Sequence, residues 1–415
     1  MENNIFELQY AMDTFYFLIC GALVMWMAAG FAMLEAGLVR AKNTTEILTK
    51  NVALFAIAST MYLICGYEFM YDGGFFLSGT AGAVDSAAVL AASAEAGFAD
   101  MGEYSGASDF FFQVVFVATA MSIVSGAVAE RMKLWAFLAF AVVMTGFIYP
   151  IEGSWTWNGD AVPFIGELNY SDYAGSGIVH LAGAAAALAG VLVLGARKGK
   201  YAADGTVQAI PGANLPLATL GTFILWMGWF GFNGGSQLAM GSIGDVADVS
   251  RIFANTNAAA AAGSIAALIL TQILYKKPDL TMVLNGALAG LVAITAEPLT
   301  PTLGSAAIIG AIGGVIVVFG VPLLDKLKID DVVGAIPVHL FAGIWGTIAV
   351  VFTNSDASLS TQLYSIIVVG LFTFIASGVL WYVIKSVSGI RVSEEDEITG
   401  LDISELGMPA YDIVK

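Results

Sequence analysis

The sequence has few charged residues and little positive charge. Charged residues make up 12% of its 415 residues, about half of the roughly 25% typical of a soluble globular domain. This shortage argues against a soluble fold. The formal net charge of −17 argues against nucleic-acid binding, which needs a basic surface. No basic residues precede the first apolar run, so a cleavable signal peptide is not expected.

Cysteine and histidine are equally scarce, with two of each. Cys20 and Cys65 both fall inside apolar runs. We interpret them as small buried hydrophobic residues rather than as a disulfide or a metal-binding pair. With so few ligands available, no metal site and no cofactor motif are predicted.

Apolar residues dominate what remains. They form 58% of the chain and recur in runs of about 20 residues, which suffices for a helix to cross a hydrocarbon core of about 30 Å. Only helices and closed barrels span lipid, and these runs are too long and too continuous for barrel strands. The predicted fold class is therefore an all-α integral membrane protein with eleven transmembrane helices. The predicted spans are 11–36, 47–70, 109–130, 134–151, 172–196, 213–233, 253–274, 281–298, 302–324, 333–353 and 360–386.

Lysine and arginine predict the orientation of these spans. Of the 16 basic residues, only Arg251 falls in an even-numbered connection, and the N-terminal segment has none. By the positive-inside rule, the N-terminus lies outside and the C-terminus in the cytoplasm. The predicted organisation is a transmembrane domain over 1–386, with an acidic external loop at 72–108, and a cytoplasmic tail over 387–415.

A short repeat links the two halves of the chain. Val179-His180-Leu181 lies in the fifth span and Val338-His339-Leu340 in the tenth. Because five is odd, two similar halves of five spans would have opposite orientations, with a site near the midplane and the eleventh span outside the repeat.

His180 and His339 are the chain's only histidines. An ionisable residue at mid-membrane depth indicates a functional cavity, although a histidine that only bonds a neighbouring helix is the alternative. A metal pair is disfavoured because no third ligand is evident. Imidazole suits a substrate that gains and loses a proton near physiological pH, and two neutral rings can share one N–H.

Residues 172–197, from Asp172 through His180 to Arg197, resemble the signature of the ammonium transporter family (Amt/Mep/Rh), of the bacterial and archaeal Amt type. Other segments that resemble this family lie at 126–133, 228–236, 255–263 and 393–407. The resemblance implies a homotrimer in the cell membrane, with a narrow pore for ammonium or ammonia in each eleven-helix protomer. It also implies methylammonium as a substrate analogue.

The resemblance also implies roles for particular residues. Phe116 and Phe232 match the aromatic gate, and His180 and His339 the relay in the pore. Trp157 and Ser236, with Phe116, match the external recruitment site. An indole face attracts a cation by about 0.5–2 kcal/mol. Asp172 matches a residue that supports backbone near the cation, and as an N-cap it would open the fifth helix.

The sequence differs from the family pattern at two positions, and one further acidic residue is expected to form an ion pair. Trp155 competes with Trp157 because the local sequence is Gly-Ser-Trp-Thr-Trp. Gly334 stands where some members have an aspartate, which affects local cap chemistry. Glu35 is expected to pair with Arg40 and to have no transport role.

The predicted mechanism is recruitment of ammonium outside, loss of its proton near the gate, and passage of ammonia. Three alternatives remain: a sensor that signals through its tail, an electroneutral gas channel of the Rhesus type, and an intramembrane enzyme. The last lacks a nucleophile or cofactor motif, so no enzyme activity is expected. A PII-type signalling protein is a possible partner at the cytoplasmic face.

Overall fold

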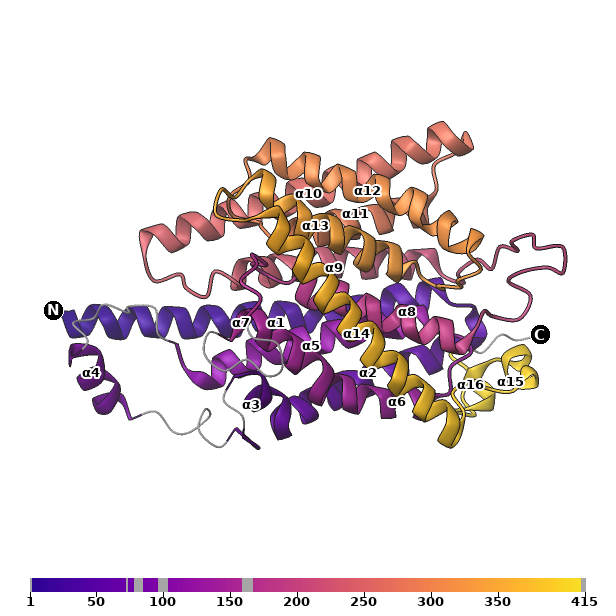
Figure 1. The fold of residues 1–415 in the computed structure, drawn as a ribbon, viewed down its shortest axis with the longest axis horizontal. Helices are drawn as coiled ribbons and strands as arrows, with labels where there is room; N and C mark the ends of the chain where they lie inside the picture. Colours follow the sequence, from indigo (N-terminus) through magenta and orange to yellow (C-terminus); the bar gives the residue numbers. More distant parts are fainter. Residues whose placement is uncertain (1, 72–73, 78–84, 96–103, 159–166, 412–415) are drawn as a thin grey trace.

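The computed structural model describes residues 2–71, 74–77, 85–95, 104–158 and 167–411, and its regular structure is helical. Two isolated bridges are the only strand-like pairings among these residues. The long helices lie roughly along one axis, and the chain termini lie at opposite ends of it (Figure 1). The predicted external loop 72–108 falls partly outside the described residues.

Nine described helical runs are long and apolar enough to cross a membrane. They are α1 (Glu2–Leu38, with the candidate span Asn4–Leu38), η1 to α3 (Ala41–Met70), α5 (Gly106–Ala127), α6 to α7 (Leu134–Trp157), η4 to α8 (Ser176–Leu194), α9 (Leu215–Gly235), α10 (Ile243–Tyr275), α12 (Leu303–Lys326) and α14 (Leu359–Ser388).

Two shorter apolar runs complete the set. They are α11 (Leu280–Thr295) and the run η5 to η6 (Pro337–Phe352), which includes α13 (Ala342–Ala349). They coincide with the predicted spans 281–298 and 333–353. The all-helical membrane fold is thus confirmed, while the count of eleven crossings stays a prediction.

Helix starts follow local capping chemistry more than hydropathy. The span predicted from residue 253 belongs to a helix that starts at Ile243, because Ser242 and Asp245 form a capping box. The predicted start of the fifth span at Asp172 is four residues early, since helical structure starts at Ser176. Polar residues beyond an apolar run can continue its helix, so hydropathy misplaces these ends.

Glycine residues allow helices to approach closely, both between the two halves of the chain and within the second half. A Cβ atom added to Gly221 of α9 would lie 2.3 Å from the backbone nitrogen of Leu34 in α1. In α12, a Cβ atom on Gly310 would lie 2.1 Å from the Ala259 carbonyl oxygen of α10. Small residues at such crossings permit backbone contact, which is the main source of helix association in lipid.

The C-terminal segment packs against the ends of helices from its own chain. It contains α15 (Glu394–Thr399) and α16 (Leu401–Ser404). Asp402 accepts hydrogen bonds from the backbone N–H groups of Thr44 and Glu46 at 3.1 and 2.9 Å, and Glu405 accepts one from Leu134 at 2.8 Å. These carboxylates therefore cap the N-termini of α2 (Thr44–Met61) and α6 (Leu134–Val143).

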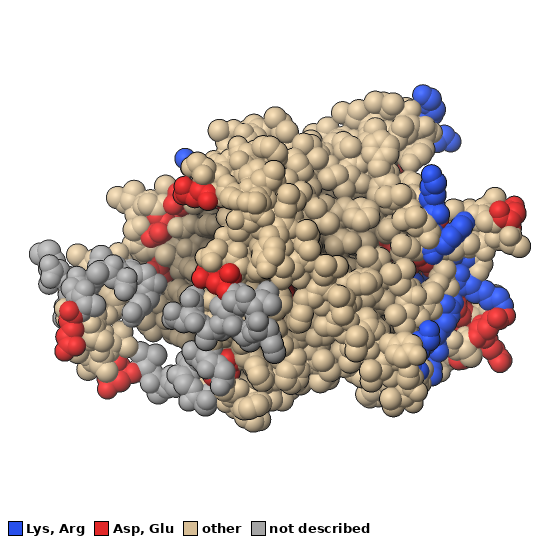
Figure 2. Space-filling model, in the orientation of Figure 1, with Lys and Arg blue, Asp and Glu red and all other residues tan. Residues whose placement is uncertain are grey.

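Charge is unevenly distributed along the long axis. On the face shown in Figure 2, lysine and arginine gather at the end where Figure 1 places the C-terminus. A network of buried ion pairs lies in this region, centred on Arg197, which is 3.1 Å from Glu130 and 2.8 Å from Asp330. Arg40 joins the network through Glu130 at 2.6 Å.

The expected pair of Glu35 with Arg40 is wrong. Arg40 pairs with Glu130, while Glu35 accepts hydrogen bonds from Asn51 and Ser125 at 2.9 and 2.8 Å. Arg40 lies beyond the end of α1 at Leu38, where Glu130 offers it a partner. Glu35 instead lies within the helix and turns toward α2 and α5.

Candidate functional site

A cavity of about 280 Å³ brings together residues from several helix ends. Trp157 ends α7 (Tyr149–Trp157), Ser236 follows α9, and Phe116 belongs to α5. The three residues predicted for recruitment all line this cavity. Their assembly follows from topology, because these segments end or begin on the same side of the bundle.

The two polar groups of this trio are oriented by backbone carbonyls. The Trp157 indole N–H donates to the Asp172 carbonyl at 3.1 Å, which fixes the ring. The Ser236 hydroxyl donates to the Phe232 carbonyl at 2.9 Å. Because its one proton is used there, the Ser236 oxygen can accept a bond from an N–H donor in the cavity.

Trp155, the rival to Trp157, lies elsewhere. Its ring packs edge-on against Phe372 at 4.8 Å between centroids, and the residue is 1% exposed. It is absent from the described lining of the cavity, which includes Trp157.

Sequence reasoning missed other residues in this cavity. They are Tyr71, Tyr104, Asp109, Phe112, Gln113, Tyr173 and Leu238. Asp109 is oriented by the Tyr67 hydroxyl and by Gln113, whose amide nitrogen lies 3.3 Å away. An acidic residue at the start of an apolar span was a usable signal, since such a group is costly unless it faces a cavity or a partner.

Phe116 lines the cavity, and Phe232 packs against it. Their ring centroids are 4.1 Å apart with the planes tilted by 33°, and the two residues are 1% and 0% exposed. The Phe116 ring also meets Trp157 edge-on at 6.1 Å. Together these three rings form a continuous aromatic cluster that starts at the cavity.

The two histidines continue this series of rings from Phe232. The His180 ring is 5.4 Å from that of Phe232 and stacks on Trp229 at 5.0 Å. The Nδ1 atoms of His180 and His339 are 3.1 Å apart. At that distance one ring nitrogen donates and the other accepts, so two neutral rings share a single N–H between them.

Each histidine occupies a π-helical segment with the same local design. His180 lies in η4 (Ser176–Leu181) and His339 in η5 (Pro337–Phe341). Such segments are rare and occur frequently at functional sites. In each half an aspartate, Asp172 or Asp331, lies three residues before a glycine at positive φ and eight residues before the histidine. The φ angles are 106° at Gly175 and 80° at Gly334.

The aspartates cap these segments from a distance. Asp172 accepts backbone N–H bonds from Gly175, Gly177 and Ile178 at 2.9–3.1 Å. In the second half, Asp331 accepts from Gly334 and Ile336 at 3.1 and 2.7 Å. The prediction that Asp172 is the N-cap itself is wrong, because Gly175 occupies that position. The Asp172 carboxylate instead reaches the first backbone N–H groups from three residues upstream. Gly334 leaves the cap chemistry intact because Asp331 supplies it.

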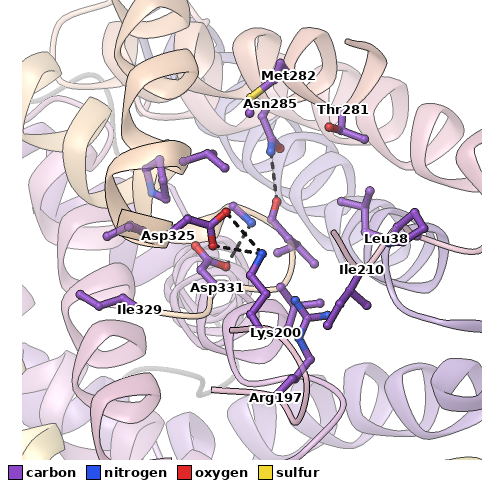
Figure 3. Close-up of a pocket in the computed structure, with 18 residues that line it drawn as sticks. Leu38, Arg197, Lys200, Ile210, Thr281, Met282, Asn285, Asp325, Ile329 and Asp331 are labelled. Atoms are coloured by element: carbon purple, nitrogen blue, oxygen red, sulfur yellow. Dashed lines mark hydrogen bonds and ion pairs between the residues drawn. The ribbon is translucent and has the colours of Figure 1, made fainter. Parts of the chain in front are cut away.

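Two further cavities continue beyond the histidines. The first, of about 10 Å³, is lined by His339, Glu35, Asn285 and Val333 among others. The second, of about 220 Å³, shares Asn285, Val333 and Gly334 with the first. Figure 3 shows the larger cavity with Arg197, Lys200, Asp325 and Asp331 around it, and with Asn285 donating to the Val333 carbonyl at 3.1 Å.

The ion pairs near the larger cavity are strongly coupled. Burial alone would raise the pKa of Glu130, but Arg197 and Arg40 hold that pKa below its ordinary value. Burial likewise opposes ionisation of Asp330, yet hydrogen bonds from Arg197 and the charge of Arg131 lower its pKa well below the usual range. Both carboxylates therefore remain charged at neutral pH.

Comparison with known proteins places this arrangement in a family. The model of the Ammonium Transporter Family matches residues 15–411. The chain is 43% identical to ammonium transporter Amt2 of Archaeoglobus fulgidus, over 96% of this chain and 88% of that protein. It is 41% identical to a putative ammonium transporter of Synechocystis, with coverage of 98% and 90%.

Solved structures agree with the sequence comparison. A structure described as a sensor Amt protein superposes with a TM-score of 0.87 at 33% identity, covering 98% of this chain and 100% of that one. Candida albicans Mep2 superposes with a TM-score of 0.81 at 25% identity, covering 98% and 92%. The chain belongs to the ammonium transporter family and is a multi-pass protein of the cell membrane.

Proposed function

We propose that this protein conducts ammonium or ammonia across the cell membrane. The observation that carries the proposal is a continuous series of side chains between two cavities: Trp157, Phe116, Phe232, His180 and His339. An aromatic barrier followed by two neutral ring nitrogens suits a small N–H donor that can lose a proton. Family membership supports the same substrate.

The proposed route starts at the outer cavity. Ammonium binds between the Trp157 face and the Ser236 oxygen, which together replace part of its hydration. A bare ion in an apolar channel would cost tens of kcal/mol by Born estimates, far more than a cation–π contact of about 0.5–2 kcal/mol returns. The ion therefore gives up its proton near the Phe116/Phe232 gate, and ammonia passes along the histidine pair. Potassium has no N–H and is excluded.

We extend the proposal to the assembly. The protein crosses the membrane eleven times, with five spans repeated in inverted orientation and a last span outside the repeat. The basic end in Figure 2 faces the cytoplasm, as the positive-inside rule requires. The proposed domains are 1–386 in the membrane and 387–415 as the tail, three copies assemble, and a PII-type protein is a candidate partner at the basic end.

The test is electrical. Purified protein in liposomes on a solid-supported membrane is pulsed with ammonium, methylammonium or potassium. We expect currents for the first two and none for potassium. Trp157→Leu should weaken the apparent affinity for ammonium by roughly 2- to 30-fold, the equivalent of losing a cation–π contact of about 0.5–2 kcal/mol.

The control variant is Trp135→Leu, because Trp135 is 79% exposed and lies at the start of α6, away from the cavity. Equal losses in both variants would contradict the recruitment site. Without a current, an internal pH dye separates the remaining functions: alkalinisation would indicate an electroneutral channel. No flux at all would favour a sensor, the function that the likeness to the sensor Amt protein supports.

A further inference from the structure

Glu35 is a buried carboxylate that the proposed route does not yet use. It lies near the end of α1, is 1% exposed, and is surrounded by α2 and α5. One of its oxygens, Oε2, accepts both hydrogen bonds, from the Asn51 amide at 2.9 Å and the Ser125 hydroxyl at 2.8 Å. These two bonds explain its orientation, but they do not require a charge.

The other oxygen is free. Oε1 of Glu35 accepts no hydrogen bond from any residue that the structure describes. A buried polar atom without a partner is rare and calls for an explanation. The buried cation Lys50 acts on Glu35 electrostatically, which offsets part of the cost of a buried carboxylate but does not pair with this atom.

The cavity that Glu35 lines supplies the explanation. The same space of about 10 Å³ is lined by His339, and a volume of that size holds about one water molecule. On its other side it meets the 220 Å³ cavity of Figure 3 through Asn285, Val333 and Gly334. Glu35 therefore lies between the histidine pair and the basic end of the molecule.

We propose that Glu35 is the proton acceptor on the inner side of the histidine pair. Ammonium loses a proton to a ring nitrogen of the pair, and an N–H bond forms there. That proton passes from His339, through one water, to the Glu35 carboxylate, where an O–H bond forms and the imidazole is neutral again. Glu35 then releases the proton toward the larger cavity. Ammonia and the proton thus both cross, by separate routes, and charge moves with each ammonia.

The inference rests on the proposed function, so its test separates proton movement from ammonia movement. Liposomes with wild type or Glu35→Gln receive an ammonium pulse, and current and internal pH are recorded on the same preparation. Glutamine preserves the fold, because its side-chain oxygen can accept from Asn51 and Ser125 while its NH2 group takes the place of Oε1. It cannot accept the proton.

We expect Glu35→Gln to lower the current by about a hundredfold, the low end of the roughly 10²–10⁴-fold that a positioned acid or base contributes, while ammonia still enters and alkalinises the interior. The matched control is Glu46→Gln. Glu46 is also buried, lies on the adjacent helix 3.8 Å from Lys50, and is outside both inner cavities as described. It should retain the wild-type current.

Each other outcome is decisive. A Glu35→Gln current within about twofold of wild type would overturn the inference, and so would a parallel loss of current and ammonia entry, which would mark a structural role. Ammonia entry without current in the wild type would also overturn it. If the wild type gives neither signal, the proposed transport function fails, independently of Glu35.

Discussion

Single carboxylates at the start of the two π-helical segments hold the histidines in place. Asp172 uses both oxygens on three backbone N–H groups, and its own carbonyl accepts from Trp157. One residue therefore connects the outer cavity with the segment that bears His180. The same position in the second half, Asp331, accepts two backbone hydrogen bonds, at 3.1 and 2.7 Å.

Asp172→Asn should destabilise the protein by about 2–3 kcal/mol, because hydrogen bonds to a charged acceptor are worth about 1.5–3 kcal/mol each and an amide replaces one acceptor with a donor. Asp331→Asn should cost less, since it has fewer such bonds. The measurement is the unfolding midpoint of each purified variant. Asp356→Asn, at an exposed position, is the control. An equal midpoint for Asp172→Asn and the control would contradict this account.

At this scale, sequence reasoning identified the residues whose type is unusual for their depth. His180 and His339, and aromatic residues at span ends, stood out in this way, and the structure brings them together. Glu35 and Asp109 were not assigned to a site, although their charge was visible. Their roles depend on which helix they face, and a difference of one position on a helix turns a side chain by about 100°.

Among the helices, the second half is held by backbone contact more than by large side chains. Gly263 in α10 and Gly310 and Gly314 in α12 have carbonyl oxygens within 2.1–2.3 Å of where a Cβ atom would lie. No flexible side chain is available to move there, so the helices themselves must separate. In lipid, that separation removes the packing that drives helix association.

Gly310→Ala should therefore lower stability by roughly 3 kcal/mol, at the upper end of the usual cost of overpacking. Gly304 on the same helix is the matched control, because the nearest atom to its added Cβ would be the Thr302 hydroxyl at 3.9 Å. Thermal unfolding of both alanine variants in detergent tests the prediction. If Gly310→Ala unfolds at the same temperature as Gly304→Ala, backbone contact is not what holds these helices.

Hydropathy located each long helix, because the length of an apolar run is set by the membrane, but it placed the starts of α1 and α10 nine and ten residues too late, at 11 and 253 instead of Glu2 and Ile243. It did not predict the π-helical segments at Tyr62–Gly66, Met144–Ile148, Ser176–Leu181 and Pro337–Phe341. A shift from i+4 to i+5 hydrogen bonding leaves the hydrophobic content of a run unchanged. The 159-residue separation of the histidines reflects the repeat, which the sequence indicated by a tripeptide.

Across the whole molecule, the ion pairs at the basic end link four connections between helices, which contain Arg40, Glu130, Arg197 and Asp330. Arg197 bonds Glu130 and Asp330, and the Arg131 guanidinium donates to the Asp330 carbonyl at 2.6 Å. The pairing was not predictable, because the sequence fixes how many basic residues lie at this end but not which acid each one meets. The tail adds acidic caps to the same end.

This network predicts how stability depends on pH. The pKa values of Glu130 and Asp330 are lowered by their arginine partners. Their contribution is therefore complete above the ordinary carboxyl pKa of about 4 and is lost as pH falls through the lower folded values. Asp330→Asn should cost about 3 kcal/mol at pH 7 and progressively less below about pH 4.

Denaturant unfolding of wild type and Asp330→Asn between neutral and strongly acidic pH measures this difference. Asp356→Asn again serves as the control, with no pH-dependent gap from wild type expected. If the difference in unfolding free energy between wild type and Asp330→Asn stays constant down to the lowest pH, Asp330 stabilises the fold through packing and hydrogen bonds that do not depend on its charge.

The matched aspartate, glycine and histidine positions of the two halves have a consequence for direction. The histidine segments at the centre of the proposed conduit match, but their neighbours differ: the Phe232 ring lies against His180 on one side, and Glu35 lines the cavity at His339 on the other. In the proposed conduit, any preference for inward movement must come from these unlike neighbours, from the unlike ends, one aromatic and acidic and the other rich in arginine and lysine, or from the gradients outside.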